Sequence, residues 1–240
     1  MPDIAREKLA VVRPDATLVL GDVSAEVEAL AVETGAEIVR PIELDVPLRG
    51  YQRTNFLLAV TAAQMQLQGA EPVPAAVDGD TPGGLGASHP AEVAARIEVP
   101  GRLQRIGEDP LTILDGAHNP SGMAALAAAL EDVIGARPLV AVVSVLDDKD
   151  AAGMLRALLG KCAAVVFTAS RNPRALPPAT LASLAGQLGG PPAELVNDPA
   201  AALERARELA GPEGAVLATG SIYLVADLLG EPGRRRVSAL

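Results

Sequence analysis

Short apolar runs alternate with longer segments of helical spacing along the second half of this 240-residue chain. Unbroken apolar runs are typical of parallel strands that helices cover on both faces, and right-handed crossovers connect such strands. The predicted strands are 111–114, 139–145, 164–168, 194–196 and 215–218, and the predicted helices lie near 122–133, 151–159, 178–188, 200–209 and 222–229. The second half therefore predicts an α/β domain with a Rossmann-like open parallel sheet.

The first part of the chain has a weaker pattern. Helical spacing occurs at 4–11, 25–34 and 55–68, and strand-like runs occur at 17–20 and 37–39. A sheet of so few short strands is small for an independent α/β domain. The stretch from 70 to 89, which includes His89, is rich in Gly and Pro without periodicity and predicts a loop. We predict two domains, 1–98 and 99–240, of which the first is the remainder of a larger domain.

The composition limits which cellular compartment and which classes of binding partner we predict. Apolar residues make up 49% of the chain and aromatic residues only 2%, so Ala, Val, Leu and Ile must form the core. The net charge of −10 argues against nucleic acid or an anionic membrane surface as a partner. No apolar run approaches the roughly 20 residues that span a bilayer. A single cysteine, Cys162, and a charged N-terminus without a signal-peptide pattern predict a cytoplasmic protein.

The most informative stretch is 114–120, Leu-Asp-Gly-Ala-His-Asn-Pro. A buried strand ends there at Asp115, and His118 and Asn119 follow before a helix begins. Backbone N–H groups and the helix dipole converge at such a junction, which is where open α/β sheets bind ligands. Polar clusters also follow the next two predicted strands, at 144–150 and 170–174. We therefore predict a ligand site at the edge that these strand ends share.

Several stretches, in order along nearly the whole chain, carry a family resemblance. They are Ile-Ala-Arg-Glu-Lys at 4–8 with 11–14 and 18–21, Gly-Tyr-Gln-Arg-Thr-Asn at 50–55, Pro-Gly-Arg-Leu-Gln at 100–104, the stretch 114–120, and the segments 146–150, 173–177 and 219–224. Together they resemble the folylpolyglutamate synthase/dihydrofolate synthase family of Mur-type amide ligases. The resemblance implies a Mur ligase C-terminal domain preceded by the remnant of the central ATP-binding domain. It also implies ATP-dependent addition of L-glutamate to tetrahydrofolate, to dihydropteroate, or to both, through an acyl phosphate.

The resemblance implies a role for each matching side chain on the ATP side. The implied ATP contacts are Asn55, Arg102, Asp115, His118 and Asn119. A guanidinium fork such as that of Arg102 suits phosphate oxygens, and the Asp115 carboxylate can accept from ribose hydroxyls. Lys8 matches a lysine whose carbamate helps to hold Mg²⁺, a hard cation that prefers oxygen ligands. The alternatives are a solvated lysine at Lys8 and helix N-caps at Asn55 and Asn119.

Four further residues are candidates for the glutamate side: Lys149, Asp150, Arg174 and Ser221. Lys149 could meet the incoming glutamate or the transferred phosphate, and Arg174 could meet a carboxylate of the amino acid. Ser221 follows a predicted strand and could line the same edge. The alternative for residues 148–150 is a helix cap with solvated charges.

One required element is absent from the 240 residues. The sequence contains neither Gly-x-x-x-x-Gly-Lys-Ser/Thr nor the family's form Gly-Thr-Asn-Gly-Lys-Ser, and no lysine follows the glycines at 83–86. That loop cradles the polyphosphate of ATP and holds Mg²⁺ through its hydroxyl. We therefore expect a truncated or split form, inactive alone, with a separate N-terminal half that carries the loop as a candidate partner. The alternatives are a non-catalytic nucleotide-binding module and a fragment of another Mur-type ligase.

Overall fold

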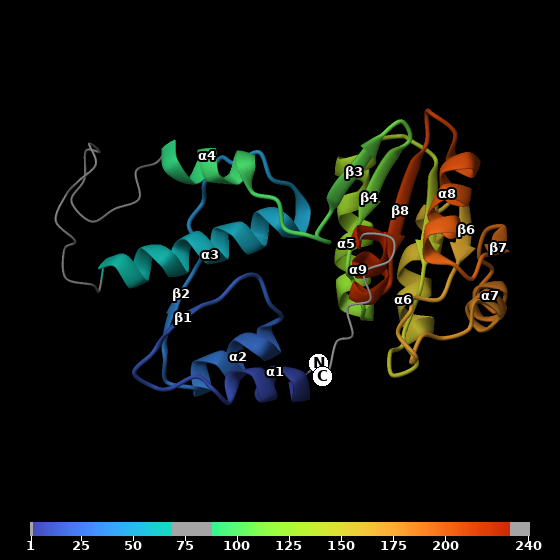
Figure 1. Ribbon diagram of the computed structural model, residues 1–240. Coiled ribbons are helices and arrows are strands. Elements are labelled where there is room, and N and C mark those ends of the chain that lie inside the picture. The colour runs from blue at the N-terminus through green and yellow to red at the C-terminus, as the bar shows by residue number, and fades with distance from the viewer. Residues whose placement is uncertain (1, 69–87, 231–240) are drawn as a thin grey trace. The chain divides into compact units, whose positions relative to one another are not determined.

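The computed structural model describes residues 2–68 and 88–230, which fall into two compact units, 1–97 and 98–240 (Figure 1). We call them the N-terminal unit and the C-terminal unit. Among the residues that the structure describes, none of the helices combines the length and the apolar character needed to cross a membrane.

The N-terminal unit contains a two-stranded sheet and four helices in its described part. Its elements are α1 (Pro2–Leu9), β1 (Thr17–Val19), α2 (Ala25–Glu33), β2 (Glu37–Val39), α3 (Gly50–Gln68) and α4 (Ser88–Arg96). The two strands pair in parallel over three residues, from Thr17 opposite Glu37 to Val19 opposite Val39. A cavity of about 280 Å³ is lined by α1, α2 and Val12. Apolar side chains remain exposed around it, with Val11 83% exposed.

Two expectations for the N-terminal unit are wrong. The helix α3 begins at Gly50, so Asn55 lies inside it and is not its N-cap. Its start was missed because residues 50–54, Gly-Tyr-Gln-Arg-Thr, carry no apolar pattern of helical spacing. His89 belongs to α4, where a loop was expected. The glycines at 83–86 lie outside the described residues.

The C-terminal unit is built on a six-stranded sheet with the strand order β3-β4-β8-β5-β6-β7. The strands are β3 (Gln104–Glu108), β4 (Leu111–Leu114), β5 (Leu139–Val143), β6 (Ala164–Phe167), β7 (Ala193–Leu195) and β8 (Ala215–Thr219). The helices are α5 (Pro120–Ile134), α6 (Ala151–Leu158), the short 3-10 helix η1 (Leu159–Lys161), α7 (Pro178–Gln187), α8 (Pro199–Ala210) and α9 (Ile222–Leu229). All neighbouring pairs from β4 to β7 are parallel, which confirms the Rossmann-like sheet.

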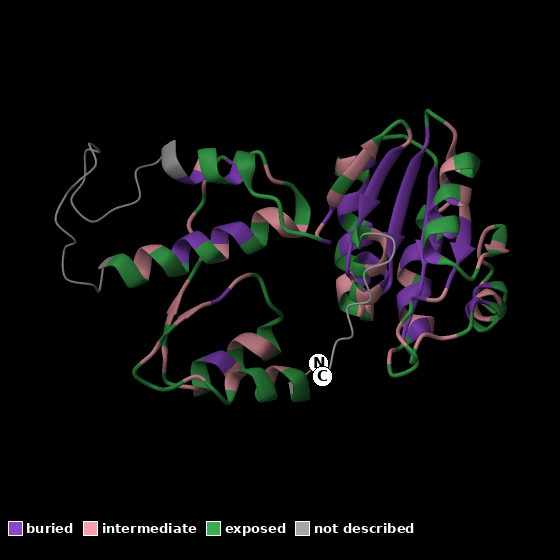
Figure 2. Ribbon diagram, viewed as in Figure 1, coloured by how far each residue is buried: buried purple, intermediate pink, exposed green. Residues whose placement is uncertain are grey.

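Burial explains why the central strands were predictable. Every residue of β4, β5 and β8 is buried, and these strands form the purple centre of Figure 2. Helices cover both sides, since α8 packs on β5, β6, β8 and α9, whereas α5 packs on α6. Strands enclosed in this way carry continuous apolar runs.

The edge strand β3 was not predicted. It pairs antiparallel with β4, from Gln104 opposite Leu114 to Glu108 opposite Leu111, with a bulge between Arg105 and Gly107. Its residues alternate between exposed and partly buried, so no continuous apolar run marks it. An antiparallel edge strand can leave one face in water, which removes the signal that reveals the inner strands.

The sheet topology indicates which edge of the sheet can bind a ligand. Strand β8 lies between β4 and β5, although β5 follows β4 in the chain. The chain leaves β5 toward α6 and leaves β8 toward α9. Because α6 packs with α5 and α9 packs with α8, the two connections diverge to opposite faces. Such a switch point, at the carboxyl ends of parallel strands, is where open α/β sheets form a crevice.

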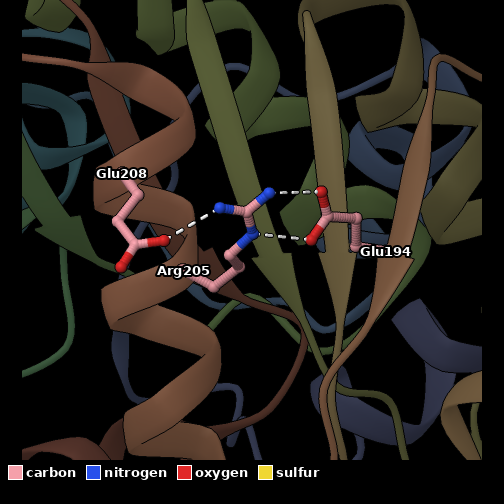
Figure 3. A network of polar contacts seen from close by, with 3 residues as sticks. All are labelled: Glu194, Arg205 and Glu208. Carbon is pink, nitrogen blue, oxygen red and sulfur yellow. Dashed lines mark hydrogen bonds and ion pairs between the residues drawn. The ribbon is translucent and has the colours of Figure 1, made fainter.

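An ion-pair network joins the other edge strand, β7, to α8 (Figure 3). Arg205 donates from Nε and Nη2 to the two carboxylate oxygens of Glu194, at 2.8 and 2.9 Å, and from Nη1 to Glu208 at 2.8 Å. This two-bond geometry is the one that a guanidinium fork prefers with a carboxylate. The hydrogen bond from Arg205 lowers the pKa of Glu194 below its usual value.

We expect Glu194→Gln to destabilise the C-terminal unit at pH 7, and the difference from wild type to shrink in acid. A carboxyl whose pKa is lower when folded stabilises the fold above its unfolded pKa of about 4.3 and loses that effect as the pH falls through the folded value. Urea unfolding of both proteins between pH 7 and pH 3 measures this. Glu213→Gln, at an exposed loop position, is the matched control. A difference that does not depend on pH contradicts the assignment.

Candidate functional site

The Asp115 carboxylate lies at the carboxyl end of β4 and is buried, with 2% of the residue exposed. Its backbone N–H continues the strand by donating to Ala218 O at 2.9 Å. Its Oδ2 accepts from the Leu103 N–H at 2.9 Å, and its Oδ1 accepts from the Ala117 N–H at 2.9 Å. One side chain therefore holds together the segment before β3 and the loop after β4.

Arg102 lies directly against that loop. Gly116 donates its N–H to Gly101 O at 2.8 Å, and Arg102 Nη1 donates to the same carbonyl at 3.1 Å. A Cβ on Gly116 would lie 2.7 Å from Arg102 Nη1 and 2.9 Å from Ile222 Cγ2. Any side chain at position 116 would therefore displace the guanidinium or α9. The C-terminal unit thus gathers Arg102, Asp115 and His118, three of the predicted ATP contacts.

His118 and Asn119 complete the loop. His118 Nδ1 lies 2.9 Å from Gly116 O, and because a carbonyl can only accept, the proton of this contact belongs on Nδ1. In the neutral ring Nε2 is then an acceptor. Asn119 is the N-cap of α5, since its Oδ1 accepts from the Gly122 N–H at 2.7 Å and Pro120 follows at the first helical position. The helix-cap alternative for Asn119 is therefore confirmed.

The loops after β5 and β6 bring two predicted glutamate contacts together. Lys149 Nζ and Arg174 Nη1 lie 3.0 and 3.4 Å from the same oxygen, Oδ2, of Asp148. The Asp147 N–H donates to Arg174 O at 2.8 Å and joins the two loops. The hydrogen bond from Lys149 lowers the pKa of Asp148, so this carboxylate stays charged between the two cations.

Asp150 and Ser221 are helix caps. Asp150 Oδ1 accepts from the Gly153 N–H at 2.8 Å at the start of α6, which confirms the cap alternative for this residue. Ser221 is buried and its Oγ accepts from the Tyr223 N–H at 3.1 Å at the start of α9. Both helices therefore begin at the carboxyl edge of the sheet.

Buried hydroxyls lie at the same edge, two of them within the predicted polar clusters 144–150 and 170–174, although their burial was not predicted. Ser144 follows β5, and its Oγ accepts from the Ser170 N–H at 3.0 Å. Within the part of the chain that the structure describes, Ser170 Oγ and Thr219 Oγ1 are buried without a hydrogen-bond partner. Gly220 has φ 98°, and a Cβ there would collide with Ser144 O. The sequence signal for these residues was the short polar residue that directly follows each apolar strand.

Lys8 and Asn55 belong to the N-terminal unit. Lys8 lies on α1 with 76% of its side chain exposed, and its Nζ is 3.6 Å from Glu7 Oε1. Asn55 is exposed on α3. Across residues 2–68 and 88–230, no three His, Cys, Asp or Glu side chains gather as a metal site. The carbamate at Lys8 stays a prediction.

Cys162 offers no thiolate chemistry. It lies next to β6, and burial raises the pKa of its thiol to about 12. A thiol with so high a pKa is protonated at neutral pH and is a poor nucleophile.

Comparison with known proteins places this site in a family. Residues 101–222 match the model of the Mur ligase, glutamate ligase domain. The chain is 33% identical over 241 residues to a probable bifunctional folylpolyglutamate synthase/dihydropteroate synthase of Haloferax volcanii. This alignment covers 92% of this chain and 26% of the Haloferax protein. It is 45% identical over 97 residues to the dihydrofolate synthase/folylpolyglutamate synthase of Mycobacterium tuberculosis, across 40% of this chain and 20% of that protein.

A solved structure agrees with these matches. The folylpolyglutamate synthase of Mycobacterium tuberculosis, complexed with ADP and AMPPCP, superimposes with a TM-score of 0.79 at 27% identity, over 96% of this chain and 60% of that one. The chain therefore belongs to the Mur ligase family of ATP-dependent ligases and corresponds to the C-terminal part of its folylpolyglutamate and dihydrofolate synthases. It spans about a quarter of the Haloferax protein and about three fifths of the Mycobacterium structure.

We expect Asn119→Ala to lower the free energy of unfolding by about 1 kcal/mol, because it removes the N-cap of α5. Asn119→Asp is the matched control, since a carboxylate oxygen can accept the same Gly122 N–H. Urea unfolding followed by circular dichroism measures both. Equal losses in the two variants would show that the cap is not what Asn119 contributes to stability.

Proposed function

We propose that this chain is the C-terminal part of an ATP-dependent ligase that adds L-glutamate to tetrahydrofolate, to dihydropteroate, or to both. The observation that supports it most directly is the cluster of Arg102, Asp115 and His118 at the carboxyl end of β4. The related Mycobacterium synthase has been solved with ADP and AMPPCP. In this proposal the nucleotide binds at that cluster.

The candidate nucleotide contacts in this cluster are Arg102, His118, Asp115 and Asn119. Asp115 and Asn119 each accept backbone N–H groups, and because each of their oxygens has two lone pairs they can also accept from sugar hydroxyls. Arg102 offers guanidinium N–H groups to phosphate oxygens, and His118 offers Nε2 to the sugar or the base. Asn55, on the N-terminal unit, is a further candidate for the base. ATP carries Mg²⁺, and we assign the described residues no step through the metal.

The proposed glutamate-binding residues lie in the loops that follow β5 and β6. Lys149 and Arg174 present two cations held by one carboxylate, Asp148. Glutamate carries two carboxylates, and charge-assisted hydrogen bonds to them would orient the amino acid. Its amine then attacks the acyl phosphate, forms the amide and releases phosphate. Ser221 is a further candidate contact, because it lies at the start of α9, directly after β8, and β8 is the neighbour of β5 in the sheet.

Catalysis also needs a phosphate cradle, because phosphoryl transfer depends on positioning and charge neutralisation. We propose that a part bearing the P-loop joins the N-terminal unit to supply it. The sheet of that unit has two parallel strands, and parallel sheets are normally larger and covered on both faces. Ile4, Val11 and Val32 are exposed on the same unit, which is apolar surface that such a part could cover.

A second candidate is a nucleotide-binding module without catalysis. It needs only the cluster of Arg102 and His118 at the end of β4. The two candidates share the nucleotide site and differ in whether a P-loop-bearing part restores ligation.

We expect the chain to bind ADP, and Arg102→Ala to weaken binding about tenfold, because charge-assisted hydrogen bonds are worth about 1.5–3 kcal/mol each. Calorimetric titration with ADP and Mg²⁺ measures this. Arg156→Ala, which removes an exposed arginine of α6, is the matched control. Equal affinity of wild type and Arg102→Ala would place the nucleotide elsewhere.

We expect ATP- and glutamate-dependent extension of a folate only when a P-loop-bearing N-terminal part of a related synthase is mixed with this chain. In the mixture, Lys149→Ala should raise the KM for glutamate about tenfold and leave the KM for ATP nearly unchanged, because one charge-assisted contact is lost. Lys161→Ala, at an exposed position of η1, is the control. Ligation by this chain alone would contradict the proposal that a separate P-loop-bearing part is needed for catalysis. No activity at saturating partner would favour the binding module.

A further inference from the structure

The loop after β6, residues 168–177, is held at its start by side chains from outside the loop. The Ser170 N–H donates to Ser144 Oγ at 3.0 Å, and the Arg171 N–H donates to Asp227 Oδ2 at 2.7 Å. Ser144 directly follows β5, whereas Asp227 lies on α9, 56 residues after Arg171. Two consecutive backbone N–H groups of the loop are therefore fixed by two different elements of the fold.

The loop then returns to the sheet through contacts that surround Arg174. The Arg174 N–H donates to Asn172 Oδ1 at 2.9 Å, and the Arg174 carbonyl accepts from the Asp147 N–H at 2.8 Å. Ala175 forms an isolated antiparallel bridge with Leu146. The position of the Arg174 backbone therefore depends on both arms of the loop, and the outgoing arm is the one that the two side chains anchor.

Asp227 occupies a position that its own helix does not favour for a carboxylate. The helix α9 ends at Leu229, so Asp227 belongs to its last turn. A negative charge there opposes the helix dipole, because the negative end of the dipole is at the C-terminus of the helix. The compensating contact lies outside α9, in the charge-assisted hydrogen bond from the Arg171 N–H. Asp227 therefore serves the loop after β6 rather than the helix that carries it.

We propose that Asp227 is a positioning residue for the amino-acid substrate and that it acts through Arg174. The inference rests on the proposed function, in which Arg174 meets a carboxylate of glutamate. The side chain of Arg174 is 51% exposed and its Nη1 lies 3.4 Å from Asp148 Oδ2. Because an exposed ion pair of this kind contributes little, the backbone decides where the guanidinium lies. By holding the Arg171 N–H, Asp227 keeps that backbone in place before the ligand arrives, so less freedom is lost on binding.

The first test does not require a substrate. Asp227→Ala removes the acceptor of the Arg171 N–H, whereas Asp227→Asn keeps an amide oxygen that can accept it. Amide hydrogen exchange, measured by NMR on the full chain, should become about tenfold faster at Arg171 in Asp227→Ala and change less than about threefold in Asp227→Asn. Unchanged exchange at Arg171 in Asp227→Ala, or an equal rise at the amides of β6 and α9, overturns the proposal.

The second test measures ligand affinity on the full chain, with L-glutamate followed by NMR titration and ADP by calorimetry. Asp227→Ala should weaken glutamate binding about fivefold and leave ADP affinity nearly unchanged, because only the loop that carries Arg174 loses an anchor. Asp227→Asn should restore glutamate affinity to within about twofold of wild type. Asp132→Ala, which removes an exposed carboxylate of α5, is the matched control. Equal losses for both ligands, or no rescue by asparagine, would contradict the proposal.

The third comparison asks whether Asp227 acts through Arg174. Arg174→Ala should weaken glutamate binding about tenfold, and the double variant with Asp227→Ala should bind no more weakly than Arg174→Ala. Losses that multiply to about fiftyfold would show that Asp227 acts independently and would overturn the positioning role. If Arg174→Ala binds glutamate as wild type does, the proposed glutamate contact fails and this inference fails with it. If only Asp227→Ala keeps wild-type affinity, the contact stands and the positioning role alone is wrong.

Discussion

The hydrogen bonds of one buried carboxylate hold the candidate site together. Asp115 ends a strand whose four residues are all buried, and its side chain binds the N–H groups of Leu103 and Ala117. The turn before β3 is also held by the Gly101 N–H, which donates to Gln104 Oε1 at 2.9 Å, and by the Gly116 N–H, which donates to Gly101 O at 2.8 Å. Together these contacts keep Arg102 beside Gly116.

The inner sheet could be predicted from the sequence because β4, β5 and β8 are enclosed on both faces and therefore carry unbroken apolar runs. The strand β3 could not, since an exposed antiparallel edge leaves no such run. That omission hid the approach of Arg102 to Gly116, because the hairpin of β3 and β4 brings the two together. The caps at Asn119 and Asp150 were correct as alternatives. The polar clusters that contain Ser144 and Ser170 were predicted at this edge, but the burial of Ser144, Ser170 and Thr219 was not, because burial of short polar residues depends on tertiary packing.

The two units differ in how completely they bury their apolar surface. The C-terminal unit encloses its sheet with helices on both sides. The N-terminal unit has a two-stranded parallel sheet and leaves Val11 and Val32 exposed. This contrast fits a ligase whose nucleotide-positioning and glutamate-facing groups lie on one self-contained domain, while its phosphate cradle comes from a part that joins the other unit. In the proposed function, the paired cations Lys149 and Arg174 and the cluster at Arg102 would bind different substrates at one edge of the sheet.

A crystal structure of the chain soaked or grown with ADP tests most directly whether this edge of the sheet binds the nucleotide. The phosphates should lie within hydrogen-bond distance of the Arg102 guanidinium, with His118 beside the sugar or the base, and the Asp115 carboxylate should still bind Leu103 N–H and Ala117 N–H. ADP in the cavity lined by α1 and α2, or phosphates that do not approach the Arg102 guanidinium, would contradict the central claim.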